Sequence, residues 1–97
     1  MNRHFFSFQV ISGVGDHPLG IAFNPVNKDM YVANEVSNTV SVIDSSTNTV
    51  ISTISFGSNS APVDIAFNPT NNDMYVTDVG LGDVSVIEHS SKINLTT

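Results

Sequence analysis

The sequence has no cysteine and no tryptophan, and only three of its 97 residues are basic. Without cysteine, disulfides and thiolate metal sites are excluded. Nine acidic residues give a formal net charge of −6. Such a chain offers no basic surface to displace counterions from nucleic acid, and anionic membranes repel it. We therefore expect no nucleic-acid partner.

Long apolar runs are also missing from the sequence. No stretch approaches the roughly 20 apolar residues that a membrane-spanning helix needs, so no membrane insertion is expected. At the N-terminus, Ser7 and Gln9 interrupt a short apolar stretch, and no small-residue cleavage site follows. This pattern does not predict a signal peptide.

Small polar residues fill much of the chain, with 13 Ser, 8 Thr and 11 Asn. This mixture favours strands and tight turns over helices. Val, Ile, Phe and Tyr are abundant enough to form a core, which argues against disorder. The length allows one domain at most.

An internal repeat organises the sequence. Ile21-Ala22-Phe23-Asn24-Pro25 recurs 44 residues later as Ile65-Ala66-Phe67-Asn68-Pro69, and 15 of 27 aligned positions between 18–44 and 62–88 are identical. Fixed-period self-similarity is the signature of a repeat architecture. We divide the chain into the outer strand of an incomplete preceding unit (1–12), a first unit (13–56) and a second unit (57–97) that ends in a short fourth strand.

Within each unit the apolar pattern has a period of two, which is typical of β-strands. Met30 and Val32 alternate with Tyr31 and Ala33, so both faces of the strand are apolar, as in a sheet packed between other sheets. The Asn-Pro pairs predict hairpin turns. The predicted strands are 19–23, 29–34, 39–44 and 49–55 in one unit, 63–67, 73–78, 83–88 and 93–97 in the next, and an outer strand over 5–11.

Four antiparallel strands in about 44 residues is the spacing of a β-propeller blade. The segments Met30-Tyr31-Val32-Ala33-Asn34 and Met74-Tyr75-Val76-Thr77-Asp78, each followed by Val-Ser-Val-Ile, resemble the YVTN repeat. The resemblance covers nearly the whole chain and implies an all-β propeller of the kind found in archaeal and bacterial surface-layer and secreted proteins. It implies a cell-surface or secreted setting. The second copy departs from the motif at Asp78, where the family has Asn.

Two four-stranded blades leave an apolar face open on each, and repeat units generally need about three or more neighbours. The chain could close into a ring by head-to-tail homo-oligomerisation, as a trimer or tetramer. It could also be part of a longer propeller, or a sandwich of two sheets that bury their faces against each other. The N-terminal strand of one protomer is predicted to complete the last blade of its neighbour.

No catalytic motif is present: the sequence has no nucleophile elbow, Walker loop, paired-histidine zinc motif or EF-hand. Asp64 begins an inner strand where the other copy has Gly20, and inner strands line a propeller's channel. We predict ligand-binding residues at the channel mouth: Asp16, His17, Asp64 and Asp78. Their carboxylates could bind a divalent cation, although acidic loop residues are commonly only solvated. No other cofactor is predicted.

The sequence favours a non-catalytic propeller module that binds a protein or ligand, or acts as a scaffold. Its binding face would be formed by the loops 13–18, 34–38, 57–62 and 78–82. The alternative is an enzyme, since similar propellers include lactonases and lyases with acids and histidines in the central channel. That would require Asp16, His17 and Asp64 from several protomers to converge, and near-identical blades argue against it.

Overall fold

The computed structural model of the chain describes residues 6–88. Its strands are β1 (Pro18–Asn24), β2 (Asp29–Asn34), β3 (Thr39–Asp44), β4 (Thr49–Ser55), β5 (Pro62–Asn68), β6 (Asp73–Asp78) and β7 (Asp83–Ile87). Each agrees with a predicted strand to within one residue at either end. The predicted strand over 93–97 lies outside the described residues. No helix within 6–88 is long and apolar enough to cross a lipid bilayer.

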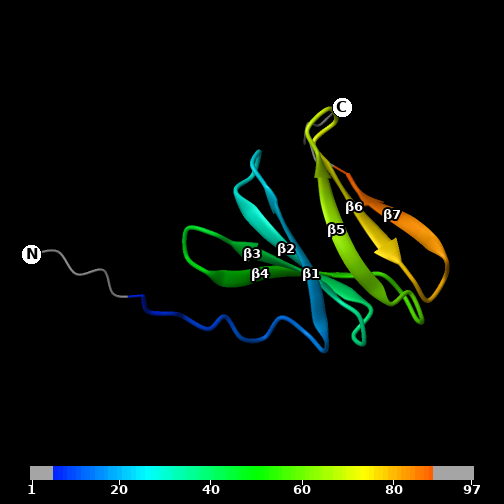
Figure 1. Ribbon diagram of the computed structural model, residues 1–97, viewed down its shortest axis with the longest axis horizontal. Helices are drawn as coiled ribbons and strands as arrows, with labels where there is room; N and C mark the ends of the chain where they lie inside the picture. The colour runs from blue at the N-terminus through cyan, green and yellow to red at the C-terminus, as the bar shows by residue number, and fades with distance from the viewer. Residues whose placement is uncertain (1–5, 89–97) are drawn as a thin grey trace, which may run out of the picture.

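The strands form two antiparallel sheets, which confirms the all-β prediction. Sheet 1 has four strands in the order β1-β2-β3-β4, and sheet 2 has three in the order β5-β6-β7. Each sheet is a meander of consecutive hairpins, and the two sheets stand face to face (Figure 1). The predicted outer strand over 5–11 is not formed in the part of the chain that the structure describes: residues 6–12 are in no strand and are exposed apart from a half-buried Ile11. Asn48, in the turn between β3 and β4, donates a hydrogen bond to Gln9 Oε1 at 3.3 Å.

The first hairpin of each sheet is closed by the same asparagine hydrogen bonds. Asn24 accepts a hydrogen bond from the Val26 amide through Oδ1 at 2.9 Å, and Asn27 donates to the Tyr31 hydroxyl at 2.9 Å. Asn27 Oδ1 also accepts from the Asp29 amide. Side-chain acceptors of this kind stabilise turns. The equivalent bonds in sheet 2 join Asn68 to Thr70, Asn71 to Tyr75, and Asn71 to Asp73.

The core lies between the two sheets. Alternation along the strands places one apolar set of each sheet toward the other, and burying each Val, Ile or Met side chain of this set contributes roughly 1.5–3 kcal/mol. The residues that form this cluster are Tyr31, Ala33, Val40 and Val42 from sheet 1 and Ile65, Met74 and Val76 from sheet 2. The residues of sheet 2 that are equivalent to Val40 and Val42 are Val84 and Val86, which lie on its outer face. The two sheets therefore contribute non-equivalent faces to the core.

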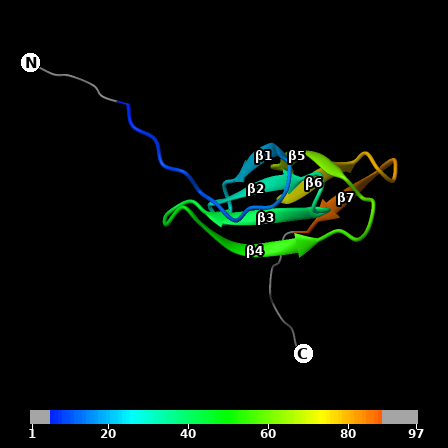
Figure 2. The same ribbon diagram turned by 90° about the horizontal axis from the view of Figure 1, so that it is seen from below.

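The first strands of the two sheets, β1 and β5, approach each other at one edge of the molecule (Figure 2). The contact is so close that a Cβ at Gly20 would lie 2.6 Å from the carbonyl oxygen of Val63 and 2.8 Å from the Cα of Asp64. Only glycine fits there without a backbone shift. This explains why the repeat has Gly at position 20 but Asp at the equivalent position 64, which is exposed.

Each sheet keeps an apolar face that the other sheet does not cover. On sheet 2, Val84 and Val86 are 57% and 45% exposed. On sheet 1, Ile21 and Phe23 are exposed, although the chain before β1 covers Asn34 and Ser41, whose side chains both donate to the Val14 carbonyl. The outer face of sheet 2 is therefore open, whereas that of sheet 1, which also carries the buried Val32 and Ile43, is only partly exposed.

Candidate functional site

The four loops predicted to form a binding face lie at one end of the molecule, here called the loop end (13–18, 34–38, 57–62 and 78–82). In sheet 1, the amide of Glu35 donates to the His17 carbonyl at 2.9 Å and that of Val36 to the Asp16 carbonyl at 3.2 Å. The Asp16 amide donates to Ser37 Oγ at 2.6 Å. These bonds join the loop before β1 to the loop between β2 and β3.

Asn38 connects the loops of the two sheets. Its Oδ1 accepts hydrogen bonds from the Ala61 amide at 3.0 Å and from Ser60 Oγ at 3.4 Å. Its carbonyl accepts from the Phe56 amide at 2.9 Å. Ala61 in turn accepts from the Val79 amide at 3.0 Å, which joins the loop between β6 and β7 to the same network. The loop end is thus one hydrogen-bonded surface across both sheets.

The backbone of this surface carries strain at matching positions. His17 has φ of 57° and Ala61 has φ of 50°, and each precedes a proline. A left-handed conformation is costly for these residue types, and a following proline restricts it further. Residues held in sparsely populated backbone conformations cluster at functional sites, where the surrounding structure imposes them.

Apolar side chains project from the loop end. Val36 between β2 and β3, and Val79 and Leu81 between β6 and β7, are all exposed. Turns are normally polar, and apolar side chains that a rigid scaffold exposes on its loops are available for contact with a partner. The sequence predicted the loops 34–38 and 78–82 as part of the binding face but did not single out these three residues. They occupy positions that differ between the two copies of the repeat.

The structure places the predicted site residues in three different surroundings. Asp16 and His17 are neighbours in an exposed loop. Asp64 is exposed on β5, where its amide donates to Thr77 Oγ1 at 3.2 Å. Asp78 is buried at the end of β6, with only 2% of its surface exposed. Within residues 6–88, no three His, Asp or Glu side chains gather closely enough to hold a metal ion.

The surroundings of Asp78 perturb its carboxyl group. Burial raises its pKa, the nearby Asp83 raises it further, and a hydrogen bond donated by Ser85 Oγ partly opposes both effects. Its Oδ1 has no hydrogen-bond partner. The equivalent residue in sheet 1 is Asn34, whose Nδ2 donates to the Val14 carbonyl at 3.1 Å, Thr39 Oγ1 at 3.1 Å and Ser41 Oγ at 2.9 Å. Asp78 thus replaces a neutral donor with a carboxyl group.

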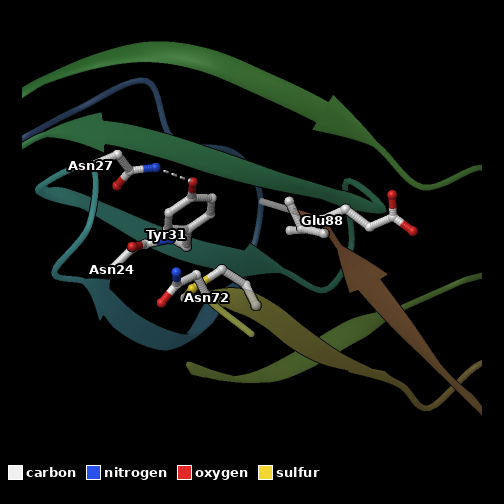
Figure 3. A pocket seen from close by; sticks show the side chains of 7 residues that line it. Asn24, Asn27, Tyr31, Asn72 and Glu88 are labelled. Atoms are coloured by element: carbon white, nitrogen blue, oxygen red, sulfur yellow. Dashed lines mark hydrogen bonds between the residues drawn. The ribbon is translucent and has the colours of Figure 1, made fainter. Parts of the chain in front are cut away.

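A pocket lies between the sheets at the opposite end, where the first hairpins of the two sheets meet (Figure 3). Its volume is about 250 Å³, just below the range of about 300–1,000 Å³ that is usual for small-molecule sites. Asn27, its amide bonded to the Tyr31 hydroxyl, faces Asn72 across the opening. The remaining lining residues are Asn24, Met74, Ile87 and Glu88.

Comparisons with known proteins identified no relative of this chain. No protein-family model matches the chain, and no curated protein is significantly similar to it in sequence. The resemblance to the YVTN repeat therefore rests on the motif residues quoted above.

Proposed function

We propose that the chain is a non-catalytic repeat module of the β-propeller type, which binds a protein partner through its loop end. The observation that carries this proposal is the loop end itself. Val36, Val79 and Leu81 are exposed there, over a backbone that Asn38 ties together across both sheets. A rigid scaffold that presents apolar groups on loops is the usual design of a protein-binding surface.

The arrangement of the two sheets supports the propeller-type reading. They pack face to face as neighbouring blades do, and their first strands lie side by side at one edge, where a propeller places its channel. The sheets have the same strand order as far as they are described. Closure into a ring remains a proposal, together with the cell-surface setting that the YVTN resemblance implies.

The enzyme alternative has less support. It requires accessible acids and histidines gathered at one mouth. Asp78 is buried against Ser85. Asp64 lies on β5, at the position where sheet 1 has Gly20. Nothing in these positions provides a base oriented by a second group, which general acid–base catalysis requires.

The proposal can be tested by selecting peptides that bind the full chain from a random-peptide phage library. We expect the selected peptides to lose at least tenfold in affinity for a Val36→Ser/Val79→Ser/Leu81→Ser variant. The control is Val26→Ser, because Val26 is also about half exposed but lies in a turn at the opposite end. Peptides that respond to Val26→Ser alone would place the binding surface elsewhere. Hydrolysis of a lactone probe that is abolished by Asp64→Asn would favour the enzyme.

A further inference from the structure

We infer that the partner bound at the loop end presents an arginine side chain to the carboxyl groups of Asp78 and Asp83, with neighbouring apolar groups that lie over Val79 and Leu81. The inference rests on the proposed function and names the chemistry of the partner that this function requires. It is carried by the acid pair (Asp78 and Asp83), by a buried carboxyl oxygen without a hydrogen-bond partner, and by the distribution of charge over the chain.

The two members of the acid pair face each other across the hairpin of β6 and β7. Asp78 and Asp83 are directly opposite residues in the register of these strands, and like charges in that arrangement are destabilising. Their equivalents in sheet 1 are Asn34 and Thr39, where Asn34 Nδ2 donates a hydrogen bond to Thr39 Oγ1 at 3.1 Å. Sheet 2 therefore has two acids where sheet 1 has a donor and an acceptor, and its hairpin over 73–87 contains no lysine or arginine.

Only one oxygen of the buried Asp78 carboxyl group has a hydrogen-bond donor. Ser85 Oγ donates to Oδ2, whereas Oδ1 has no hydrogen-bond partner among the described residues. Burying an ionised carboxyl group in this way is costly. Burial raises the pKa of Asp78, and the charge of the neighbouring Asp83 raises it further. Because Asp83 is exposed, a cation can reach the acid pair from its side and offset the repulsion between the two carboxyl groups.

The loops of the loop end carry negative charge and contain no lysine or arginine. Asp16, Glu35 and Asp78 belong to these loops, and Asp83 follows the last of them. Within residues 6–88 the one lysine or arginine is Lys28, which lies in the turn between β1 and β2 at the opposite end. A surface with charge of one sign attracts partners of the opposite sign and steers their approach. The charge distribution therefore favours a cationic partner at the loop end.

Arginine is the cation that suits both the acid pair and its apolar surroundings. Within residues 6–88, no third acid or histidine joins Asp78 and Asp83 to form a metal site. A guanidinium group is planar and donates several hydrogen bonds in a fork that matches carboxyl groups. Its apolar stem can cover hydrophobic surface, and Val79 and Leu81 are exposed in the turn that joins the two acids.

A double-mutant cycle with the peptides selected against the full chain tests this inference. We expect the selected peptides to contain an arginine beside apolar residues. Either Asp83→Asn in the chain or replacement of that arginine by glutamine in the peptide should lower the affinity by about tenfold or more. Both changes together should cost little more than either alone, because each removes the same interaction. The matched control is Glu88→Gln, which removes a charge from an exposed residue at the opposite end and should leave the affinity unchanged.

A second variant, Asp78→Asn/Asp83→Thr, guards against an effect of misfolding, because it reproduces the hydrogen-bonded pair of sheet 1. It should retain the circular dichroism spectrum of the wild type and lose the same affinity as Asp83→Asn. Stabilisation of the wild type by millimolar Ca²⁺ that is absent in this variant, with peptide binding indifferent to the arginine, would assign the acid pair to a metal ion and overturn the inference.

Selected peptides without arginine, or losses that add in the cycle, would also overturn the inference. If such peptides still respond to the loop-end variant of Val36, Val79 and Leu81, the binding module stands and only the chemistry of its partner is wrong. If the peptides ignore both the acid pair and the loop-end variant, the proposed function fails as well.

Arg3 and Lys92 lie outside the described residues, so their part is tested separately. Arg3→Gln/Lys92→Gln should bind the selected peptides as tightly as the wild type does. Tighter binding by this variant would show that cations of the chain itself occupy the acid pair, which would overturn the assignment of the pair to a partner.

Discussion

At the residue scale, the pair Asn34 and Asp78 shows how one atom changes the chemistry of an otherwise equivalent position. Both side chains are buried at the end of the second strand of their sheet, beside a serine of the third. Asn34 offers an amide to surrounding acceptors, while Asp78 offers a carboxyl group whose charge is disfavoured by burial. Asp78 lies on the same face of β6 as Met74 and Val76, and this alternation in the sequence already indicates that its side chain points into the core. The prediction that Asp78 lies at the channel mouth did not take this alternation into account.

The raised pKa of Asp78 makes stability depend on pH in a defined direction. A group whose pKa is higher in the folded state than its ordinary 3.8 contributes stability at low pH, and this is lost as pH rises through the folded pKa. We expect Asp78→Asn to stabilise the chain by roughly 1 kcal/mol at neutral pH, and the gain to shrink in acid.

Urea unfolding across a pH series, followed by circular dichroism, measures this effect. The matched variant is Asn34→Asp, which should destabilise the chain at neutral pH because it places a carboxyl group against the Val14 carbonyl. A gain from Asp78→Asn that is the same at all pH values would show that ionisation of Asp78 is not its cause.

At the element scale, the strands could be predicted from the sequence almost to the residue. The period-two pattern of Tyr31 and its neighbours, together with Asn-Pro turns, leaves little freedom in where strands begin and end. The contacts between elements could not be predicted in this way. That Asn38 bonds the Ala61 amide depends on how two sheets stack, and no periodicity within a strand encodes that distance.

The close approach of β1 and β5 gives a prediction for Gly20. Gly20→Ala should destabilise the chain by about 1–3 kcal/mol, because its Cβ must push the backbone of β5 away. Asp64→Ala, at the equivalent and exposed position, should be nearly neutral. Thermal unfolding of the two variants beside the wild type measures the contrast, and equal effects would mean that the inner strands are not held this closely.

At the scale of the whole molecule, the open apolar face of sheet 2 and the exposed Ile21 and Phe23 of sheet 1 favour association with further units. The face that sheet 2 leaves open carries Val84 and Val86, whose counterparts Val40 and Val42 form the core. The same pairing of faces can therefore continue from one copy to the next. We expect a trimer or tetramer in light scattering behind size exclusion, and a well-folded monomer over a wide concentration range would contradict a ring.

Light scattering can also separate the steric effect of the Asp64 Cβ from the effect of its negative charge where two copies would meet. In a ring built by the same pairing of faces, Asp64 would occupy the place that Gly20 has within the chain, and its Cβ would hold the inner strands apart. Asp64→Gly should raise the average mass at a fixed concentration, because it permits the closer approach. Asp64→Ala removes the charge but retains the Cβ, so an equal rise in both variants would assign the effect to charge alone.

The contrast between Gly20 and Asp64 also limits how the two repeat units can be rearranged within a chain. Unit 13–56 carries glycine where the inner strand of the following unit approaches it, so a second copy of this unit could be placed before unit 57–97 at the same spacing. Exchanging the two units would instead place the Asp64 side chain against the backbone of the following inner strand. We therefore expect a chain with exchanged units to unfold at a lower temperature than one in which unit 13–56 is repeated.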